Sequence, residues 1–162
     1  MTVRYVVLAE EIADELEKLK KVEKKIFKYL SNLEKGSSPK EIYVDSIALS
    51  LHSFYTGLEN IFRSIATKVD GDLPTGESWH SDLLIQMSTP LKQVRPNVIS
   101  ETILEHLRDL LAFRHRIRNI YSFKINEKQV TRICKDLAAH KKVLFTELNE
   151  FVQFLKKTGE NS

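Results

Sequence analysis

Residues 101–123 have the sequence ETILEHLRDLLAFRHRIRNIYSF, in which an apolar helical face ends in basic residues. Its leucines and isoleucines recur at the spacing of an amphipathic helix. At the next two positions of the same face stand Arg114 and Arg118, and Tyr121 follows on that side within about two turns. A guanidinium is rarely left unpaired against an apolar core. The helix end is therefore expected to reach an internal carboxylate, or to open into a polar cleft or a subunit interface.

The composition is that of an ordinary globular protein. The chain has 162 residues, of which 42% are hydrophobic and 29% charged, with only five glycines and four prolines. So few turn-forming residues, together with long periodic segments, predict an all-α fold. At this length we expect one domain that covers residues 1–162. The net charge of +3 does not by itself indicate a nucleic-acid partner.

Several classes of protein and site are not expected from this sequence. Cys134 is the only cysteine, so the sequence excludes an internal disulfide and a multi-cysteine metal site. Its thiol is expected to be buried. No apolar run approaches the ~20 residues that span a bilayer, and no secretion signal is evident, so we expect a cytoplasmic protein without membrane contact. Residues 69–78 lack the ligand spacing of a calcium loop. His80 and His140 are expected at the surface, and we predict no metal and no cofactor.

Four long periodic segments and one short one predict an up-and-down four-helix bundle. The short helix and its flanking loops lie between the second and the last long helices. The expected long helices cover residues 4–34, 39–68, 101–121 and 127–157, and the short one covers residues 79–87.

The boundaries of these helices carry recognisable signals. Gly36 is expected just beyond the end of the first helix. Ser38 is expected to cap the second helix, with Glu41 completing a capping box. Ser100 and Asn126 are the expected N-caps of the last two long helices.

Two residues inside the second predicted helix need an explanation. Gly57 costs about 1 kcal/mol relative to alanine, so it indicates a close helix contact or an approach to something bound. Glu59 is spaced to pair with Arg63 one turn later. Alternatively, Glu59 turns inward and meets an arginine from another helix.

The spacing of polar residues at the helix end resembles a family motif. Four residues separate Arg114 from Asn119, and one residue separates Asn119 from Tyr121. HEPN proteins, and the HepT-like toxins among them, carry arginine, four to six residues, histidine, one residue and tyrosine. Arg114 and Tyr121 match the ends of this motif, and His115 occupies the polar position that follows the arginine in many members. Asn119 stands where the family has its histidine.

The resemblance continues outside the motif. It includes residues 121–123 (YSF), residues 54–62 (FYTGLENIF), and the pairs at 73–74 (LP) and 79–80 (WH). It therefore covers the second, short and third long helices, whereas the flanking helices agree in type only.

The resemblance implies a homodimer with a cleft where two copies of this helix end meet. It also implies metal-independent ribonuclease activity on an RNA substrate. The implied partner is a cognate minimal nucleotidyltransferase, the antitoxin, which adds AMP to the motif tyrosine. That tyrosine is Tyr121 here.

The residues at the helix end suit this chemistry, and the candidate catalytic residues are Arg114, His115, Asn119 and Tyr121. RNA cleavage without metal uses the 2′-OH as nucleophile, so it needs a cation for the phosphorane and a proton carrier. Arg114 and Arg118 can supply the charge to phosphate oxygens. Asn119 cannot carry a proton, although its amide can donate a hydrogen bond. His115 is the nearby side chain that titrates near neutral pH.

Three interpretations remain open. In the first, which is favoured, the chain is a HepT-like ribonuclease toxin. In the second, it is a catalytically inactive HEPN-fold module that binds a nucleotide, RNA or the nucleotidyltransferase. In the third interpretation it is a helical scaffold in which Arg114 and Arg118 pair internally with Glu59 or Asp109. Because a monomer is expected to bury both arginines, a two-fold dimer is predicted with them near its axis.

Overall fold

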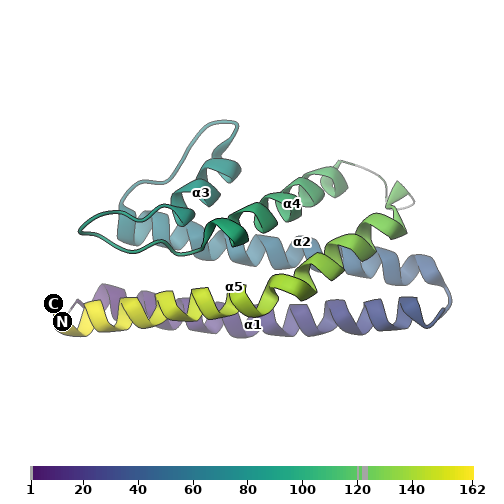
Figure 1. Cartoon of the computed structure of the whole chain (residues 1–162), viewed down its shortest axis with the longest axis horizontal. Helices are drawn as coiled ribbons and strands as arrows, with labels where there is room; N and C mark the ends of the chain where they lie inside the picture. Colours follow the sequence, from purple (N-terminus) through teal and green to yellow (C-terminus); the bar gives the residue numbers. More distant parts are fainter. Residues whose placement is uncertain (1, 120, 122–123) are drawn as a thin grey trace.

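The computed structural model describes residues 2–119, 121 and 124–162, and its architecture is helical. Ile120, Ser122 and Phe123 of the stretch that carries the family resemblance therefore lie outside the described residues. The predicted all-α fold is confirmed, with four long helices running alternately up and down and the short α3 placed beside them (Figure 1). The helices are α1 (Val3–Glu34), α2 (Lys40–Ile65), α3 (Trp79–Ser88), α4 (Glu101–Arg118) and α5 (Glu127–Asn161), and a π-helical turn, η1 (Ala66–Asp70), extends α2.

The four long helices enclose one hydrophobic core. α1 packs against α2 and α5, and both of these pack against α4, which closes the bundle. α3 rests on α2 and α4. The two chain ends lie side by side (Figure 1), where the backbone N–H of Thr2 donates to the carbonyl oxygen of Gly159 at 2.6 Å. The largest fully buried side chains include Phe54, Tyr55, Phe62 and Phe113.

The turn between α1 and α2 confirms one boundary prediction and corrects another. Gly36 has a φ of 76° and follows the C-cap of α1. The N–H of Ser37 donates back to the carbonyl of Asn32 at 3.0 Å, which satisfies a carbonyl at the helix end. The predicted Ser38 cap is wrong, because Pro39 is the N-cap residue of α2 and makes no side-chain capping hydrogen bond. The expected capping box is therefore not formed.

The predicted N-caps of the last two helices are confirmed. The Ser100 hydroxyl accepts the backbone N–H of Ile103 at 3.3 Å. The Asn126 side chain accepts the backbone N–H of Lys128 at 2.8 Å. Each contact satisfies one of the N–H groups that a helix leaves free at its start.

Gly57 lies where α2 packs closely against α1. A Cβ built on Gly57 would lie 2.5 Å from Cδ2 of Leu19, a side chain buried in the core. This distance is too short for two carbon atoms, so glycine allows the two helices to pack closely. Of the two explanations drawn from the sequence, the helix contact is confirmed.

A buried ion pair fixes the long connection between α2 and α4. Nε of Arg95 lies 2.6 Å from Oδ1 of Asp70, and its Nη2 lies 2.8 Å from Oδ2. Both side chains are almost fully buried, with exposures of 0% and 2%. The remaining Arg95 donors reach the carbonyl oxygens of Gln86, Thr89 and Pro96. The connection is therefore organised around one satisfied guanidinium.

Among the helices of residues 2–119 and 124–162, none has the length and apolar character needed to cross a bilayer.

Candidate functional site

The end of α4 differs from its prediction. The helix ends at Arg118, and Asn119 is its C-cap residue, with the side-chain amide donating to the carbonyl of His115 at 3.1 Å. Tyr121 therefore lies beyond the helix, and the prediction that it shares a helical face with Arg114 and Arg118 is wrong. Arg114 is buried, but Arg118 is exposed, so the prediction that a monomer buries both arginines holds for Arg114 only.

Arg114 is buried without a satisfying partner. Its side chain is 9% exposed, and its Nη1 lies 3.9 Å from Oε1 of Glu59, which is beyond hydrogen-bond distance. Among the described residues, Nε and Nη1 of Arg114 have no hydrogen-bond partner. The guanidinium carbon lies 5.6 Å from the ring centroid of Tyr55, in a cation–π arrangement. Buried donors of this kind are rare in folded proteins and call for an explanation.

Glu59 turns inward, as one of the two alternatives for it predicted. Its side chain is 6% exposed and approaches Arg114 from α2. Arg63, the other expected partner, is exposed and instead lies over the ring of Trp79, at 5.3 Å. Glu59 thereby brings a carboxylate to the end of α4.

His80 also contacts Glu59. Its Nδ1 lies 2.6 Å from Oε2 of Glu59, and its side chain is only 16% exposed. The ring stacks on Trp79 at 3.7 Å and meets the ring of His115 edge-on at 5.9 Å. The prediction of a surface His80 is therefore wrong. A carboxylate on one ring nitrogen fixes the orientation of the imidazole and leaves the other nitrogen for a ligand.

These side chains form what we call the Arg114 cluster: Tyr55, Glu59, His80, Arg114 and His115. The cluster joins α2, α3 and the last turns of α4. It contains one buried cation, one buried carboxylate and two imidazoles. The structure thus brings Arg114, His115 and Glu59 together, as a shared site requires, and adds His80.

His52 lies next to the Arg114 cluster and was not singled out from the sequence. Burial, followed by the positive charges of Arg114 and Arg118, lowers the pKa of His52 below its usual value. Burial and the nearby Glu59 carboxylate raise the pKa of Tyr55. The sequence does contain a signal that could have identified His52. Residues 52, 55 and 59 recur at i, i+3 and i+7, so they occupy one face of α2.

Two grooves flank the end of α4. The Arg118 groove, of about 370 Å³, includes Leu49, His52 and Arg118 in its lining. The His115 groove, of about 430 Å³, includes His115 and Asn119. Both grooves also share Ile117 and Ile125. The predicted site residues are therefore divided between the two grooves: His115 and Asn119 line one, and Arg118 lines the other.

Tyr121 follows the end of α4 and is 71% exposed. Its side chain is therefore accessible to a second protein. Asp109 was the other carboxylate considered as a partner for the arginines of α4. Its Oδ2 instead lies 3.4 Å from Nη1 of the exposed Arg132 of α5.

The Arg114 cluster has the components of a phosphate-handling site. Arg114 has vacant donors that are buried, and Arg118, one turn later, is exposed. Both side chains are guanidinium groups, the type that binds phosphate oxygens. Two imidazoles lie beside them and can accept or donate protons. The arrangement therefore suits proton transfer at a phosphate ester.

A separate group of metal-ligand types lies elsewhere, between α4 and α5. It consists of His106, Asp136 and His140, whose potential ligand atoms all lie within 4.8 Å of one another. His140 is half-buried and contacts Asp136, so the prediction of a surface imidazole is wrong. Cys134, nearby in sequence, is buried as predicted, and burial raises the pKa of its thiol to about 12.

Comparison with known proteins supplies one match. A family model described as HepT-like protein matches residues 46–155. This region extends from α2 into α5 and contains every residue of the Arg114 cluster. Neither the curated proteins nor the solved structures gave a match to the chain.

Proposed function

The chain belongs to the HepT-like family of HEPN proteins, and from this premise we propose that it is the ribonuclease toxin of a toxin–antitoxin pair. In this proposal the Arg114 cluster binds RNA and cleaves it without a metal ion. The substrate phosphate contacts Arg114 and Arg118, and His115 is the principal proton carrier.

The observation that carries the proposal is the unsatisfied guanidinium of Arg114. A structural ion pair gains its stability from hydrogen bonds that satisfy both charges. The Arg114–Glu59 pair, at 3.9 Å and with two donor nitrogens unpartnered among the described residues, lacks them. A phosphate oxygen can accept a hydrogen bond from a vacant N–H group of this kind. This favours a ligand site over a helical scaffold.

The proposed reaction uses the RNA as its own nucleophile. The 2′-oxygen attacks the adjacent phosphorus while its proton passes to His115, and the bond to the 5′-oxygen breaks. The products are a cyclic 2′,3′-phosphate and a 5′-hydroxyl. Arg114 and Arg118 stabilise the charge that develops on the phosphorane. In this proposal His80, whose Nδ1 lies 2.6 Å from Oε2 of Glu59, protonates the leaving 5′-oxygen.

The second candidate is a HEPN-fold module that binds RNA, a nucleotide or the partner without cleaving RNA. It is favoured by Asn119, because this residue stands at the position of the motif histidine and its amide cannot transfer a proton. In this case the arginines and grooves serve binding alone.

RNA binding tests the part of the proposal that both candidates share. Arg118→Ala should weaken binding of a single-stranded RNA and reduce the slope of log K against log salt by about 0.7, because one phosphate contact is lost. Arg114→Ala should act similarly. Arg4→Ala, which removes one exposed charge near the start of α1, is the matched control and should change the slope less. Fluorescence anisotropy over a range of salt concentrations measures both quantities. An unchanged slope in Arg114→Ala, with a large loss of thermal stability, would instead favour an internal salt bridge.

We also propose that residues 1–162 form one domain that assembles as a homodimer through the end of α4. Leu49, an apolar residue that is 68% exposed, lines the Arg118 groove beside Ile117 and Ile125. A second copy that covers this face would bury it and bring two clusters together.

Light scattering at micromolar concentration should therefore give the mass of a dimer. Leu49→Glu should shift the protein to the monomer, because it places a charge in the interface. Val7→Glu changes an apolar residue that is 48% exposed near the start of α1, toward the opposite end of the bundle, and should leave the dimer intact (Figure 1). A natural protein that is only monomeric contradicts the shared cleft.

The proposed partner is a minimal nucleotidyltransferase antitoxin in the cytoplasm, and its target is the exposed Tyr121. The tyrosine oxygen attacks the α-phosphorus of ATP, pyrophosphate leaves, and the phenolic proton passes to a base on the partner. Mass spectrometry after incubation with the partner and ATP should show one added AMP. Tyr121→Phe should stay unlabelled, whereas Tyr43→Phe should still be labelled. Label on another residue would contradict this assignment.

A further inference from the structure

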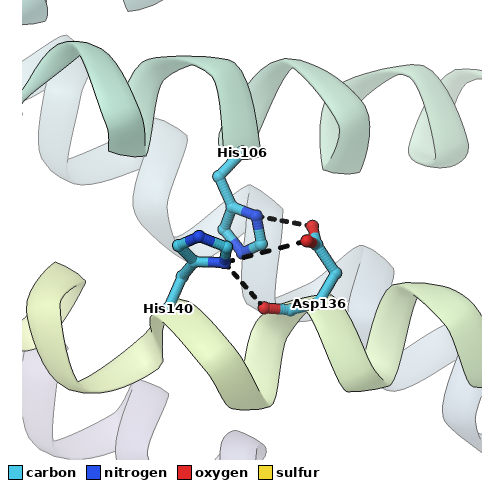
Figure 2. Close-up of side chains that lie close together, drawn as sticks. All are labelled: His106, Asp136 and His140. Carbon is cyan, nitrogen blue, oxygen red and sulfur yellow. Dashed lines mark hydrogen bonds and ion pairs between the residues drawn. The ribbon is translucent and has the colours of Figure 1, made fainter.

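Three polar side chains converge where α4 and α5 pack together, outside the Arg114 cluster (Figure 2). His106 comes from α4, and Asp136 and His140 come from successive turns of α5. Nδ1 of His106 lies 2.5 Å from Oδ2 of Asp136, and Nδ1 of His140 lies 3.7 Å from Oδ1. Nδ1 of His140 also donates to the Asp136 carbonyl oxygen at 3.0 Å. The centroids of the two imidazole rings are 3.9 Å apart.

An ion pair explains only part of this arrangement. One carboxylate needs one imidazole to balance its charge, yet two imidazole rings lie against each other beside Asp136. Two charged imidazoles at this separation would repel each other. Two neutral imidazoles and a carboxylate are, in contrast, a set of ligands that suits a divalent transition metal ion.

We propose that His106, Asp136 and His140 bind one divalent ion of the zinc type, with water as the fourth ligand. Each residue offers one ligand atom, and these atoms lie within 4.8 Å of one another. Tetrahedral zinc, with ligand bonds of about 2.0–2.2 Å, places its ligand atoms roughly 3.5 Å apart, so small side-chain rotations complete the site. Protons that occupy the ligand atoms in the metal-free protein leave to solvent when the ion binds.

The burial of the three residues suits a site that is loaded from solvent. The His106 side chain is 5% exposed, so it forms the base of the site. Asp136 and His140 are each 31% exposed, which leaves a path for the ion and room for the water ligand. His106 is on α4, whereas Asp136 and His140 are on α5, so the bound ion would link the two helices.

The proposed ion is distinct from the proposed RNA site. His106 precedes Arg114 by eight residues on α4, which is about 12 Å along the helix axis. The ion therefore does not contact the substrate phosphate, and its role is to stabilise the helix pair that carries the Arg114 cluster. This inference stands whether or not the chain cleaves RNA.

Isothermal titration calorimetry with Zn²⁺ tests the site, using the full chain without a histidine tag. The expected result is one ion per chain and a rise in melting temperature on binding. His140→Gln and Asp136→Asn, which change half-exposed residues, should bind zinc at least ~10-fold more weakly and lose the rise in melting temperature. His115→Gln removes an exposed imidazole that belongs to the Arg114 cluster and not to the proposed zinc site, so this variant should bind zinc as the natural protein does.

Circular dichroism shows whether each variant is folded, and His106→Gln is added only if it is folded. The absence of zinc binding by the natural protein would overturn the proposal. Binding of equal strength by His140→Gln and Asp136→Asn would overturn it equally, because the ion would then lie elsewhere.

Discussion

Asp70→Ala is expected to lower the free energy of unfolding by about 3–5 kcal/mol, because it leaves the buried charge of Arg95 uncompensated. Two of the guanidinium's hydrogen bonds, at 2.6 and 2.8 Å, end on the Asp70 carboxylate. Arg95 is 0% exposed, so water cannot replace them without opening the connection between α2 and α4. Urea denaturation followed by circular dichroism measures the loss.

Two further variants show whether the lost ion pair is the cause. Asp72→Ala removes an exposed carboxylate two residues away and should change stability by less than ~0.5 kcal/mol. Asp70→Leu combined with Arg95→Met removes both charges and should restore much of the lost stability. A loss below about 1 kcal/mol in Asp70→Ala would show that the pair is not important for stability.

Helix positions could be predicted from the sequence because they depend on local physics. The apolar period of 3.6 residues, the caps at Ser100 and Asn126 and the glycine at position 36 involve contacts within a few residues. The exception, Ser38, has the right residue type for a cap, but the structure places Pro39 at that position.

The partners of the site residues could not be predicted because they are distant in sequence. Glu59 and His80 are 21 residues apart, and Asp70 and Arg95 are 25 residues apart. Helical spacing identifies which residues face inward, but not which side chains from other helices they meet. An inward Glu59 could therefore be foreseen as an alternative, whereas its contact with His80 could not.

The end of α4 shows how one residue changes a site. A regular helix to Tyr121 would have aligned that residue with Arg114 and Arg118. Asn119 instead caps the helix by donating to the carbonyl of His115, and α4 ends at Arg118. Asparagine competes for backbone hydrogen bonds in this way and favours helix ends.

If His115 has not taken over proton transfer in the natural protein, Asn119→His is expected to raise the rate of RNA cleavage by about 10²–10⁴-fold, because it places a proton carrier at the position of the motif histidine. Asn119 is exposed and opens on the His115 groove, so the larger ring can be accommodated. Asn119→Gln keeps an amide without a proton to transfer and should show no gain. Initial rates of cleavage of a labelled RNA measure both effects.

Cleavage of RNA by the natural protein in the presence of a metal chelator tests the central claim most directly. If the Arg114 cluster is a metal-independent ribonuclease site, the natural protein should cleave RNA under these conditions. His115→Ala, which changes an exposed side chain, should remain folded and lose at least ~10²-fold in rate. If both the natural protein and Asn119→His leave the RNA intact, the ribonuclease assignment is contradicted and the binding module is what remains.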